Sequence, residues 1–410
     1  MSHVLITFLG KGRKEQGGYQ KANYQFESGS IRSTSFFGLA LLEELAARAP
    51  AVDHLVVLGT CSSIWDALLA DEMQENEELW YRLAEQVGNG NVDEDLLKDI
   101  APEVAKKLVA KKLANRVSLQ IIPFGRIETE QIAILQAMAE LVDDHDTVSI
   151  DVSHGFRSLP MLGYVSALFL QQIKNAKISG LYYGALEMSV QSVTPVVRLD
   201  GLLKIADWVM AVSAFRVSGD YGVFSSLLPG EEDASSMRQA GFFEKTMNIA
   251  KARNPLSKVR GRFSSISAKD PVFKLFAGEL QRETDWVDQN TYADRQLSAA
   301  RNAVRNGNYV RAAALGVEAI ITSRVIKNGQ DPLKYQNRNA ARDELNTKHR
   351  GVQRNRQESP ERAFSELNDL RNALAHGTRP DKNILGQQEV LLDEKKLSSR
   401  LSELLQTIAK

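Results

Sequence analysis

The first two hundred residues alternate short apolar runs with longer segments in which apolar positions recur every three or four residues. The short runs, rich in leucine and branched residues, predict buried strands, and the longer segments predict amphipathic helices. The predicted strands are residues 4–9, 54–59, 117–123, 147–152 and 178–183, and the predicted helices are 34–48, 63–69, 129–142 and 158–174. Strands separated by helices favour a Rossmann-like α/β fold, a parallel sheet covered on both faces.

After about residue 202 the strand signals fade and only helical periodicity continues. The predicted helices are residues 202–215, 242–253, 271–286, 292–304, 309–327, 360–376 and 394–408. Residues 219–236 predict a loop, and the Arg- and Asn-rich residues 337–357 predict a mobile loop or a frayed helix. A chain of 410 residues is long enough for two or three domains, so an all-α region is expected to follow the α/β domain.

The composition is that of an ordinary globular protein, with 43% hydrophobic and 25% charged residues. Cys61 is the only cysteine, so the chain forms no internal disulfide, as in proteins of a reducing compartment. The first residues contain no basic leader, and the longest apolar run, around residues 159–170, is too short to span a bilayer. We therefore expect a cytoplasmic protein that does not enter the membrane.

The net charge of zero conceals an uneven distribution of charge along the chain. Residues 71–100 contain ten acidic and two basic residues, whereas residues 301–379 contain fifteen lysines and arginines against eight acidic residues. The basic stretch fits a polyanionic partner such as a nucleic acid. Solvated helix faces would have the same composition, so charge alone leaves both interpretations open.

The ends of the predicted strands carry glycine, small hydroxyl residues and cations. These residues are Gly10, Lys11 and Gly12; Thr60, Cys61, Ser62 and Ser63; Gly125 and Arg126; Ser153, His154, Gly155, Phe156 and Arg157; and Tyr183 and Gly184. In an open parallel sheet, ligands bind beyond the carboxyl ends of the strands, where glycine lets backbone N–H groups approach a phosphate. Ser63 and Ser158 are candidate N-caps of the helices that follow. Any one of these loops could be an ordinary turn, but five on one edge predict a ligand site.

The common nucleotide-binding fingerprints are missing. Gly10 and Gly12 would need a third glycine where Glu15 stands, so the dinucleotide motif is incomplete. The chain also contains no GxxxxGK[ST] sequence, which argues against a P-loop ATPase.

A second candidate site lies near the C-terminus, in the predicted helix 360–376. Asn372 and His376 are four residues apart and share a face, and Arg371 lies to one side. Histidine transfers protons near neutral pH, arginine stabilises the charge that builds on phosphorus, and Asn372 could orient the phosphate or the histidine. Two copies of this helix around a two-fold axis would form one cleft in which an RNA 2′-hydroxyl attacks its own phosphodiester without a metal. Alternatively, Gly377 is a helix C-cap and His376 only responds to the helix dipole.

These two segments carry a resemblance to a known family. The sequence Asp151-x-Ser153-His154-Gly155-Phe156-Arg157-x-x-Pro160 resembles the signature of CARF domains, and Arg371-Asn372-x-x-x-His376 resembles the RxxxxH motif of HEPN ribonucleases. Their order is similar to that of the Csx-type CARF–HEPN effectors of type III CRISPR systems. The resemblance divides the chain into a CARF domain (1–200), a helical linker (201–290) and a HEPN domain (291–410).

The resemblance implies a homodimer or higher homo-oligomer that binds cyclic oligoadenylate, with the tetra-adenylate ring preferred by analogy. The ligand would activate a metal-independent endoribonuclease that needs no cofactor, cuts single-stranded RNA and leaves 2′,3′-cyclic phosphate and 5′-hydroxyl ends. Arg371, Asn372 and His376 would be catalytic, and the loops at 10–12, 60–63 and 153–157 would hold the ligand.

Three alternatives remain open at this stage. The chain could be a nucleotide-sensing regulator that binds nucleic acid or protein without cutting, or a HEPN toxin that needs no trigger. The first domain could also degrade its own ligand slowly, with Lys11, Ser62, Ser63 and His154 as the available polar groups.

Overall fold

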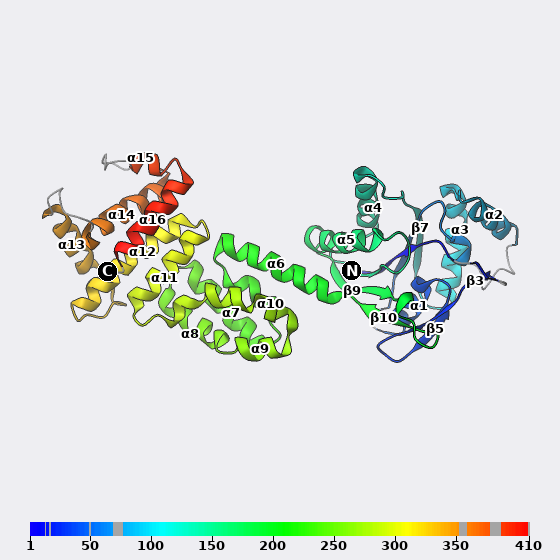
Figure 1. Cartoon of the computed structure of the whole chain (residues 1–410), viewed down its shortest axis with the longest axis horizontal. Helices are drawn as coiled ribbons and strands as arrows, with labels where there is room; N and C mark the ends of the chain where they lie inside the picture. Colours follow the sequence, from blue (N-terminus) through cyan, green and yellow to red (C-terminus); the bar gives the residue numbers. More distant parts are fainter. Residues whose placement is uncertain are drawn as a thin grey trace. The chain divides into compact units, whose positions relative to one another are not determined.

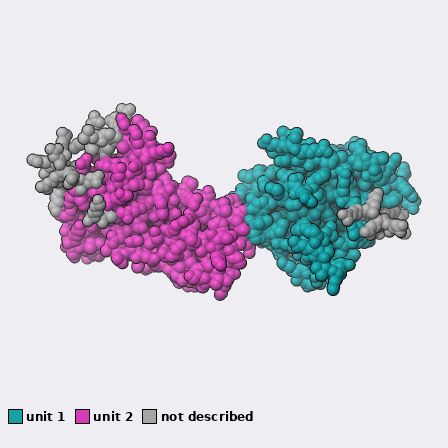
Figure 2. All heavy atoms as spheres, viewed as in Figure 1, with its two compact units in different colours: residues 1–203 teal, residues 204–410 magenta. Residues whose placement is uncertain are grey.

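The computed structural model describes residues 1–12, 14–15, 18–48, 51–68, 77–351, 359–377 and 387–408. It divides into two compact units, residues 1–203 and 204–410, which we call the sheet unit and the helical unit (Figure 2). Of the acidic stretch, Asp71, Glu72 and Glu75 lie outside the described residues.

Among the described residues of the sheet unit, eight strands form one sheet in the order β5-β4-β10-β9-β8-β1-β6-β7. These strands are β5 (Ile31–Thr34), β4 (Ala22–Gln25), β10 (Val193–Arg198), β9 (Lys177–Gly184), β8 (Thr147–Asp151), β1 (His3–Leu9), β6 (His54–Gly59) and β7 (Arg116–Ile121). From β9 to β7 all neighbours are parallel, as predicted from the sequence. β10 runs antiparallel to β9, and β5 antiparallel to β4.

Helices cover both faces of this sheet because successive side chains of the central strands point to opposite sides. Leu5, Leu55 and Val57 face a core with α1 (Phe37–Ala46), α2 (Glu77–Asn89) and α3 (Glu94–Ala110). Ile6 and Leu58 face a second core with α4 (Glu128–Glu140) and α5 (Leu159–Ile173), which lie side by side in Figure 1. The α/β architecture with a mostly parallel sheet is therefore confirmed.

The sequence analysis missed several short elements at one side of the sheet. It gave no strand for β4, β5 and β10, nor for the small hairpin of β2 (Lys14–Glu15) and β3 (Gly18–Tyr19). β5 alternates exposed and half-buried residues, so it lacks the continuous apolar run of a buried strand. The predicted helix 63–69 is also wrong in type, because the chain forms a single 3₁₀ turn there, η1 (Trp65–Leu68).

The helical unit is built on one continuous apolar core that extends from Trp208 to Leu405. Its helices are α6 (Asp200–Ser218), α7 (Glu231–Lys245), α8 (Ile249–Arg260), α9 (Phe263–Lys269), α10 (Pro271–Glu283), α11 (Tyr292–Arg305), α12 (Tyr309–Lys327), α13 (Tyr335–Gly351), α14 (Pro360–His376), α15 (Gln387–Val390) and α16 (Glu394–Thr407). Short 3₁₀ segments are η4 (Tyr221–Leu227) and η5 (Asp285–Asp288). The predicted division of this unit at residue 290 stays a prediction.

Two predictions for this region were wrong. The predicted helix 242–253 spans the break between α7 and α8, where Met247 has a φ of 60°. The predicted loop 219–236 contains η4 and the start of α7. For residues 337–357 the helical alternative holds in part, because residues 335–351 form α13, which buries Ala341 and Leu345 despite its polar sequence. The rest of that predicted segment, 352–357, lies outside the described residues.

Helices α12, α14 and α16 meet at Gly316 in the middle of α12. A β-carbon at this glycine would lie 2.8 Å from Leu405 of α16 and 3.1 Å from Leu367 of α14. The missing side chain therefore lets the three helices approach closely.

No helix in the described part of the chain is long and apolar enough to cross a membrane.

His54 makes the stability of the sheet unit depend on pH. Its side chain is 2% exposed and is held between Arg116 and Ser118, 2.7 and 2.8 Å away. Burial, aided by the charge of Arg116, lowers the pKa of His54 from 6.5 to about 4.

A lowered pKa in the folded state means that stability present above about pH 6.5 is lost as the pH falls toward 4. We expect a loss of up to about 3 kcal/mol over this range. Urea unfolding of the sheet unit at pH 7 and 4.5 measures it. In His54→Gln, which cannot take up the proton, the pH dependence should be smaller; an equal slope in both proteins would contradict this assignment.

Candidate functional site

The strand ends predicted to form a site do converge. β7, β6, β1, β8 and β9 are parallel neighbours, so their carboxyl ends lie at one edge of the sheet. Gly10, which follows β1, lies directly against the loop that follows β8, because a β-carbon at Gly10 would be 2.6 Å from the backbone nitrogen of Gly155. The two loops thus pack backbone to backbone.

Asp151, at the end of β8, stabilises this edge of the sheet through buried hydrogen bonds. Its carboxyl group is fully buried and accepts hydrogen bonds from the Thr7 hydroxyl at 2.5 Å and from the Ser153 N–H at 2.7 Å. Burial raises the pKa of Asp151, although these hydrogen bonds work in the opposite direction. The Ser153 hydroxyl in turn accepts a hydrogen bond from the Gly184 N–H at 2.6 Å. Ser153 is therefore an internal brace that ties β8 to β9.

His154 points into the same edge and is already engaged. Its Nε2 accepts a hydrogen bond from the N–H of Phe37 at 3.1 Å, in the first turn of α1, and its ring lies 5.8 Å from that of Phe36. Burial lowers the pKa of His154, which favours the neutral ring that this bond requires. The histidine thus caps α1 while one side of it faces the cavity described next.

A cavity of about 690 Å³ opens beside these loops. Four predicted ligand residues line it: Gly10, Lys11, Gly12 and His154. This volume lies within the range of small-molecule sites. Lys11 is exposed, so the wall that the β1 loop provides carries a positive charge toward solvent.

The loop at residues 60–63 is mostly turned inward. The Ser63 hydroxyl donates to the Leu9 carbonyl at 2.6 Å and accepts from the Thr60 N–H at 2.9 Å. Ser63 therefore holds the loop against β1. The prediction that it caps a helix was wrong. Ser158 makes no side-chain capping bond either, because its own backbone is already helical. Cys61 and Ser62 are half-buried beside them.

Arg126, Phe156 and Arg157 form a separate exposed group, whereas Gly125 beside them is buried. The Arg126 guanidinium lies 4.5 Å from the centre of the Phe124 ring, and this ring lies 5.7 Å from that of Phe156. Gly125 has a φ of 71°, which suits its place in the turn before Arg126. Arg157, next to Phe156, is exposed as well. None of this group lines the 690 Å³ cavity.

Arg371, Asn372 and His376 occupy the last turns of α14. Asn372 Oδ1 accepts from Arg371 Nη2 at 2.8 Å and from Nε at 3.2 Å, so the amide holds the guanidinium in one orientation. His376 is exposed and is the last residue of the helix. The helix ends at Gly377, whose φ of 62° is left-handed and whose N–H donates to the Ala373 carbonyl.

The body of α14 is fixed firmly beneath this group. Phe364, Leu367 and Leu370 are buried in the core of the helical unit. Arg400 of α16 grips Glu366 with two hydrogen bonds of 2.6 and 2.7 Å, a bidentate pair. Asn372 and His376 are therefore exposed on a firmly anchored helix, and Arg371 lies half-buried beside them.

Part of the basic stretch 301–379 is committed to the fold. Arg324 pairs with Glu361 at 2.9 Å and with Glu344 at 3.2 Å, and Arg338 and Arg342 both pair with Glu318. These arginines hold α12, α13 and α14 together. These pairs engage three arginines and three glutamates of the same stretch, so the excess of basic over acidic residues counted there is unchanged.

Comparison with known proteins identifies the sheet unit. Residues 4–187 match the model of the CARF domain of the CRISPR system endoribonuclease Csx1. The sheet unit is therefore a CARF domain of the Csx1 type. It is also similar to "CRISPR-associated protein MJ1674" of Methanocaldococcus jannaschii, with 28% identity over 335 residues that cover 75% of this chain and 52% of the relative. The chain thus spans about half the length of that relative.

The cavity of the CARF domain has walls that the sequence analysis missed. Gln20 and Lys21 come from the connection between β3 and β4, and Asn23 comes from β4. Glu187, Ser189 and Ser192 come from the connection between β9 and β10, and Thr194 comes from β10. Asn23 Nδ2 donates to the Ser192 carbonyl at 3.2 Å, which joins the two walls. The polar residues of 20–24 had no strong strand pattern, but the alternation of Tyr24 and Phe26 with polar neighbours was a weak signal.

Among the described residues, no group of three His, Cys, Asp or Glu side chains could hold a metal ion.

Gly10→Ala tests the backbone packing of the two CARF loops. The new methyl group would overlap Gly155, so the loop 153–157 must shift. We expect the free energy of unfolding of the CARF domain to fall by about 1–3 kcal/mol. Gly88→Ala in α2 is the matched control, since a β-carbon there meets no heavy atom within 4 Å. Chemical denaturation of both variants measures the difference, and equal stabilities would show that the loops are not in contact.

Proposed function

We propose that this protein is an endoribonuclease that cuts single-stranded RNA without a metal when its CARF domain binds cyclic oligoadenylate. The observation that carries the proposal is the group of half-buried Arg371 and exposed Asn372 and His376 at the end of α14, in a chain whose first domain is of the Csx1 type. The matched family model is named for an endoribonuclease, which supports the same activity here.

The residues of α14 supply the chemistry of RNA transesterification. His376 takes the proton of the 2′-hydroxyl as the O2′–P bond forms, and the P–O5′ bond breaks with return of a proton to the 5′ oxygen. Arg371, oriented by Asn372, faces the negative charge of the pentacoordinate phosphorus. The products are a 2′,3′-cyclic phosphate and a 5′-hydroxyl. Because His376 of one copy lies at an exposed helix end, a second copy completes the pocket.

The CARF domain is the proposed receptor for the activator. Gly10, Lys11 and Gly12 offer backbone N–H groups and a cation to phosphates, and the cavity beside them accepts an adenosine portion. Arg126, Phe156 and Arg157 form an outer group of cation and aromatic side chains suited to further phosphates and bases. A ring with two-fold symmetry matches two copies of one domain, and among such rings cyclic tetra-adenylate is preferred by analogy with the family.

An exposed apolar stripe on α5 supports pairing of two CARF domains. Met161, Val165 and Ile173 recur on one helix face and are 73%, 50% and 62% exposed, and Phe156 just before the helix is 41% exposed. A second copy is the proposed occupant, because the stripe begins at the ligand loop 153–157. A two-fold axis along the stripe brings both copies of that loop to one ring.

His376→Ala and Arg371→Ala are each expected to reduce RNA cleavage at least about a hundredfold. Loss of the proton-transfer group or of the phosphorane contact removes stabilisation present only in the transition state. The assay uses fluorogenic RNA with cyclic tetra-adenylate, and cleavage by the wild type is expected to persist in EDTA. Arg282→Ala, an exposed arginine of α10, is the control.

The same experiment separates the alternatives. Metal-dependent cleavage, or full activity of His376→Ala, would refute the proposed mechanism. A salt-sensitive shift of labelled RNA without products would instead identify a regulator that binds without cutting. Full wild-type activity without the cyclic nucleotide would identify an untriggered ribonuclease.

Val165→Glu is expected to weaken the dimer at least tenfold, because the pairing of two stripes would bury two like charges. Analytical ultracentrifugation measures the dissociation constant. Val109→Glu, at a 48% exposed position of α3, is the matched control and should leave the dimer intact. If both variants remain as dimeric as the wild type, the contact between copies lies elsewhere.

A further inference from the structure

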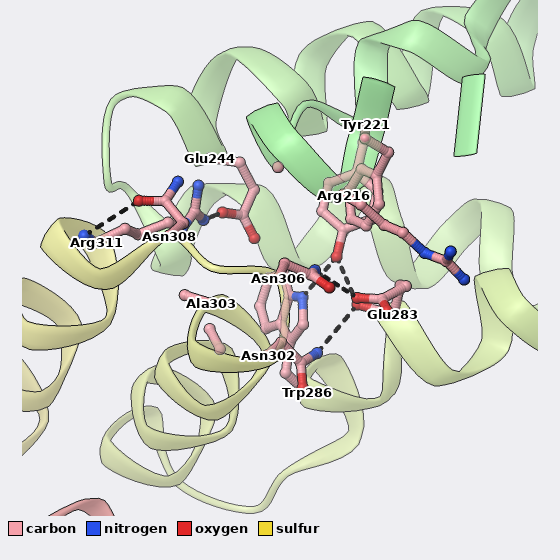
Figure 3. A pocket seen from close by; sticks show the side chains of 13 residues that line it. Arg216, Tyr221, Glu244, Glu283, Trp286, Asn302, Ala303, Asn306, Asn308 and Arg311 are labelled. Atoms are coloured by element: carbon pink, nitrogen blue, oxygen red, sulfur yellow. Dashed lines mark hydrogen bonds and ion pairs between the residues drawn. The ribbon is translucent and has the colours of Figure 1, made fainter. Parts of the chain in front are cut away.

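A buried ion pair lies where α6, α7 and α12 of the helical unit meet (Figure 3). Glu244, at the end of α7, and Arg311, in the first turn of α12, have side chains that are 3% and 13% exposed. Figure 3 shows the two side chains directed toward one another. Asn308, the N-cap of α12, accepts a hydrogen bond from the Arg311 N–H. The pair therefore fixes the start of α12 against α7.

The same guanidinium also lies against the end of α6. Gly219 follows the last residue of that helix with a φ of 67°, and a β-carbon there would lie 3.1 Å from Arg311 Nη1. The carbonyl groups at a helix C-terminus carry partial negative charge, which favours a cation at this place. Arg311 thus joins three helices through one side chain.

A polar frame surrounds the pair. The Tyr221 hydroxyl donates to the Glu283 carbonyl at 2.6 Å and accepts from Trp286 Nε1 at 3.1 Å, and Asn306 Nδ2 donates to the Glu283 carboxylate at 3.3 Å. The enclosed cavity has a volume of about 30 Å³, which holds one or two water molecules and no nucleotide. The site is consequently a structural junction and not a ligand pocket.

Helix α6 connects this junction with the CARF domain. Leu203, near its start, belongs to the core of the CARF domain, and Asp200 accepts a hydrogen bond from the Leu181 N–H of β9. Trp208 and Phe215, farther along, belong to the core of the helical unit. One helix therefore has its first turn fixed in the ligand-binding domain and its last turn at Arg311.

Helix α12 leads from the junction to a contact with α14, the helix that carries the proposed catalytic residues. Five residues after Arg311 comes Gly316, against which Leu367 of α14 packs closely. Arg371 lies one turn beyond Leu367 on the same helix. Two tight contacts thus link the end of α6 to the proposed catalytic arginine.

We infer that Arg311 and Glu244 are positioning residues that transmit ligand binding in the CARF domain to α14. The inference rests on the proposed function. A buried ion pair contributes little to stability compared with apolar side chains of the same size, but it fixes one arrangement of the helices that it joins. A ligand that prefers one position of α6 therefore biases the position of α12 and α14.

The test is the double variant Glu244→Gln/Arg311→Met, which removes both charges and keeps the volume. It is expected to fold, to bind cyclic tetra-adenylate with unchanged affinity, and to lose at least tenfold of the stimulation of RNA cleavage by that ligand. Hydrogen exchange of the α12 and α14 amides without ligand is expected to become faster. Gly219→Ala, which retains both charges but crowds the guanidinium, should reduce stimulation in the same direction, and it replaces the double variant if that protein does not fold.

Arg260→Met is the matched control. Arg260 is also 13% exposed, and in the described part of the chain it contacts Asp288, Gln281 and Thr284, none of which belongs to α6, α12 or α14. Full stimulation in the folded variants, or unchanged exchange in α14, would overturn the inference. A wild-type protein that shows no stimulated cleavage would instead refute the proposed function, and the exchange measurement would then decide on the junction alone.

Discussion

The parallel pairing of β1 with β8 is the constraint on which the ligand edge depends. Its register places Thr7 opposite Asp151, so a hydroxyl and a backbone N–H can satisfy a carboxyl group that is fully removed from water. A slip by one residue would turn Thr7 to the other face and leave Asp151 without that partner. Because Gly10 and Ser153 follow these strands within a few residues, the same register decides where the loops meet.

The two candidate sites of this protein are built in different ways. The CARF cavity collects residues from the β1 loop, from the β3–β4 connection with β4, and from the β9–β10 connection, and a hydrogen bond between Asn23 and Ser192 joins two of these walls. The proposed ribonuclease group comes from a single helix end, and its one internal brace among the described contacts is Asn372 on Arg371. The first site thus has a preformed shape in one chain, whereas the second, under the proposed mechanism, would gain its shape only through a symmetric neighbour.

The sequence predicted the alternation of strands and helices, but fewer of the short strands and of the contacts at the site. The buried strands were predictable from their continuous apolar runs, and the helices 309–327 and 360–376 from apolar residues that recur every three or four positions. The hairpin at β4 and β5 was not, since edge strands with half-exposed residues lack that signal. At the site, a glycine-rich loop looks the same whether its hydroxyls face a ligand or the fold. Ser63 and Ser153 face the fold, and only their partners Leu9 and Gly184, distant in sequence, reveal it.

The contact at Gly316 limits the kinds of motion open to the helical unit. With Leu367 and Leu405 both pressed on a position that has no side chain, α14 has no free volume in which to slide along α12. Helices α12, α14 and α16 therefore behave as one block. Any change in the position of His376, at the end of α14, then has to come from rotation of that block as a whole. Regulation would then act through the spacing of two histidine-bearing ends and would leave each end itself unaltered.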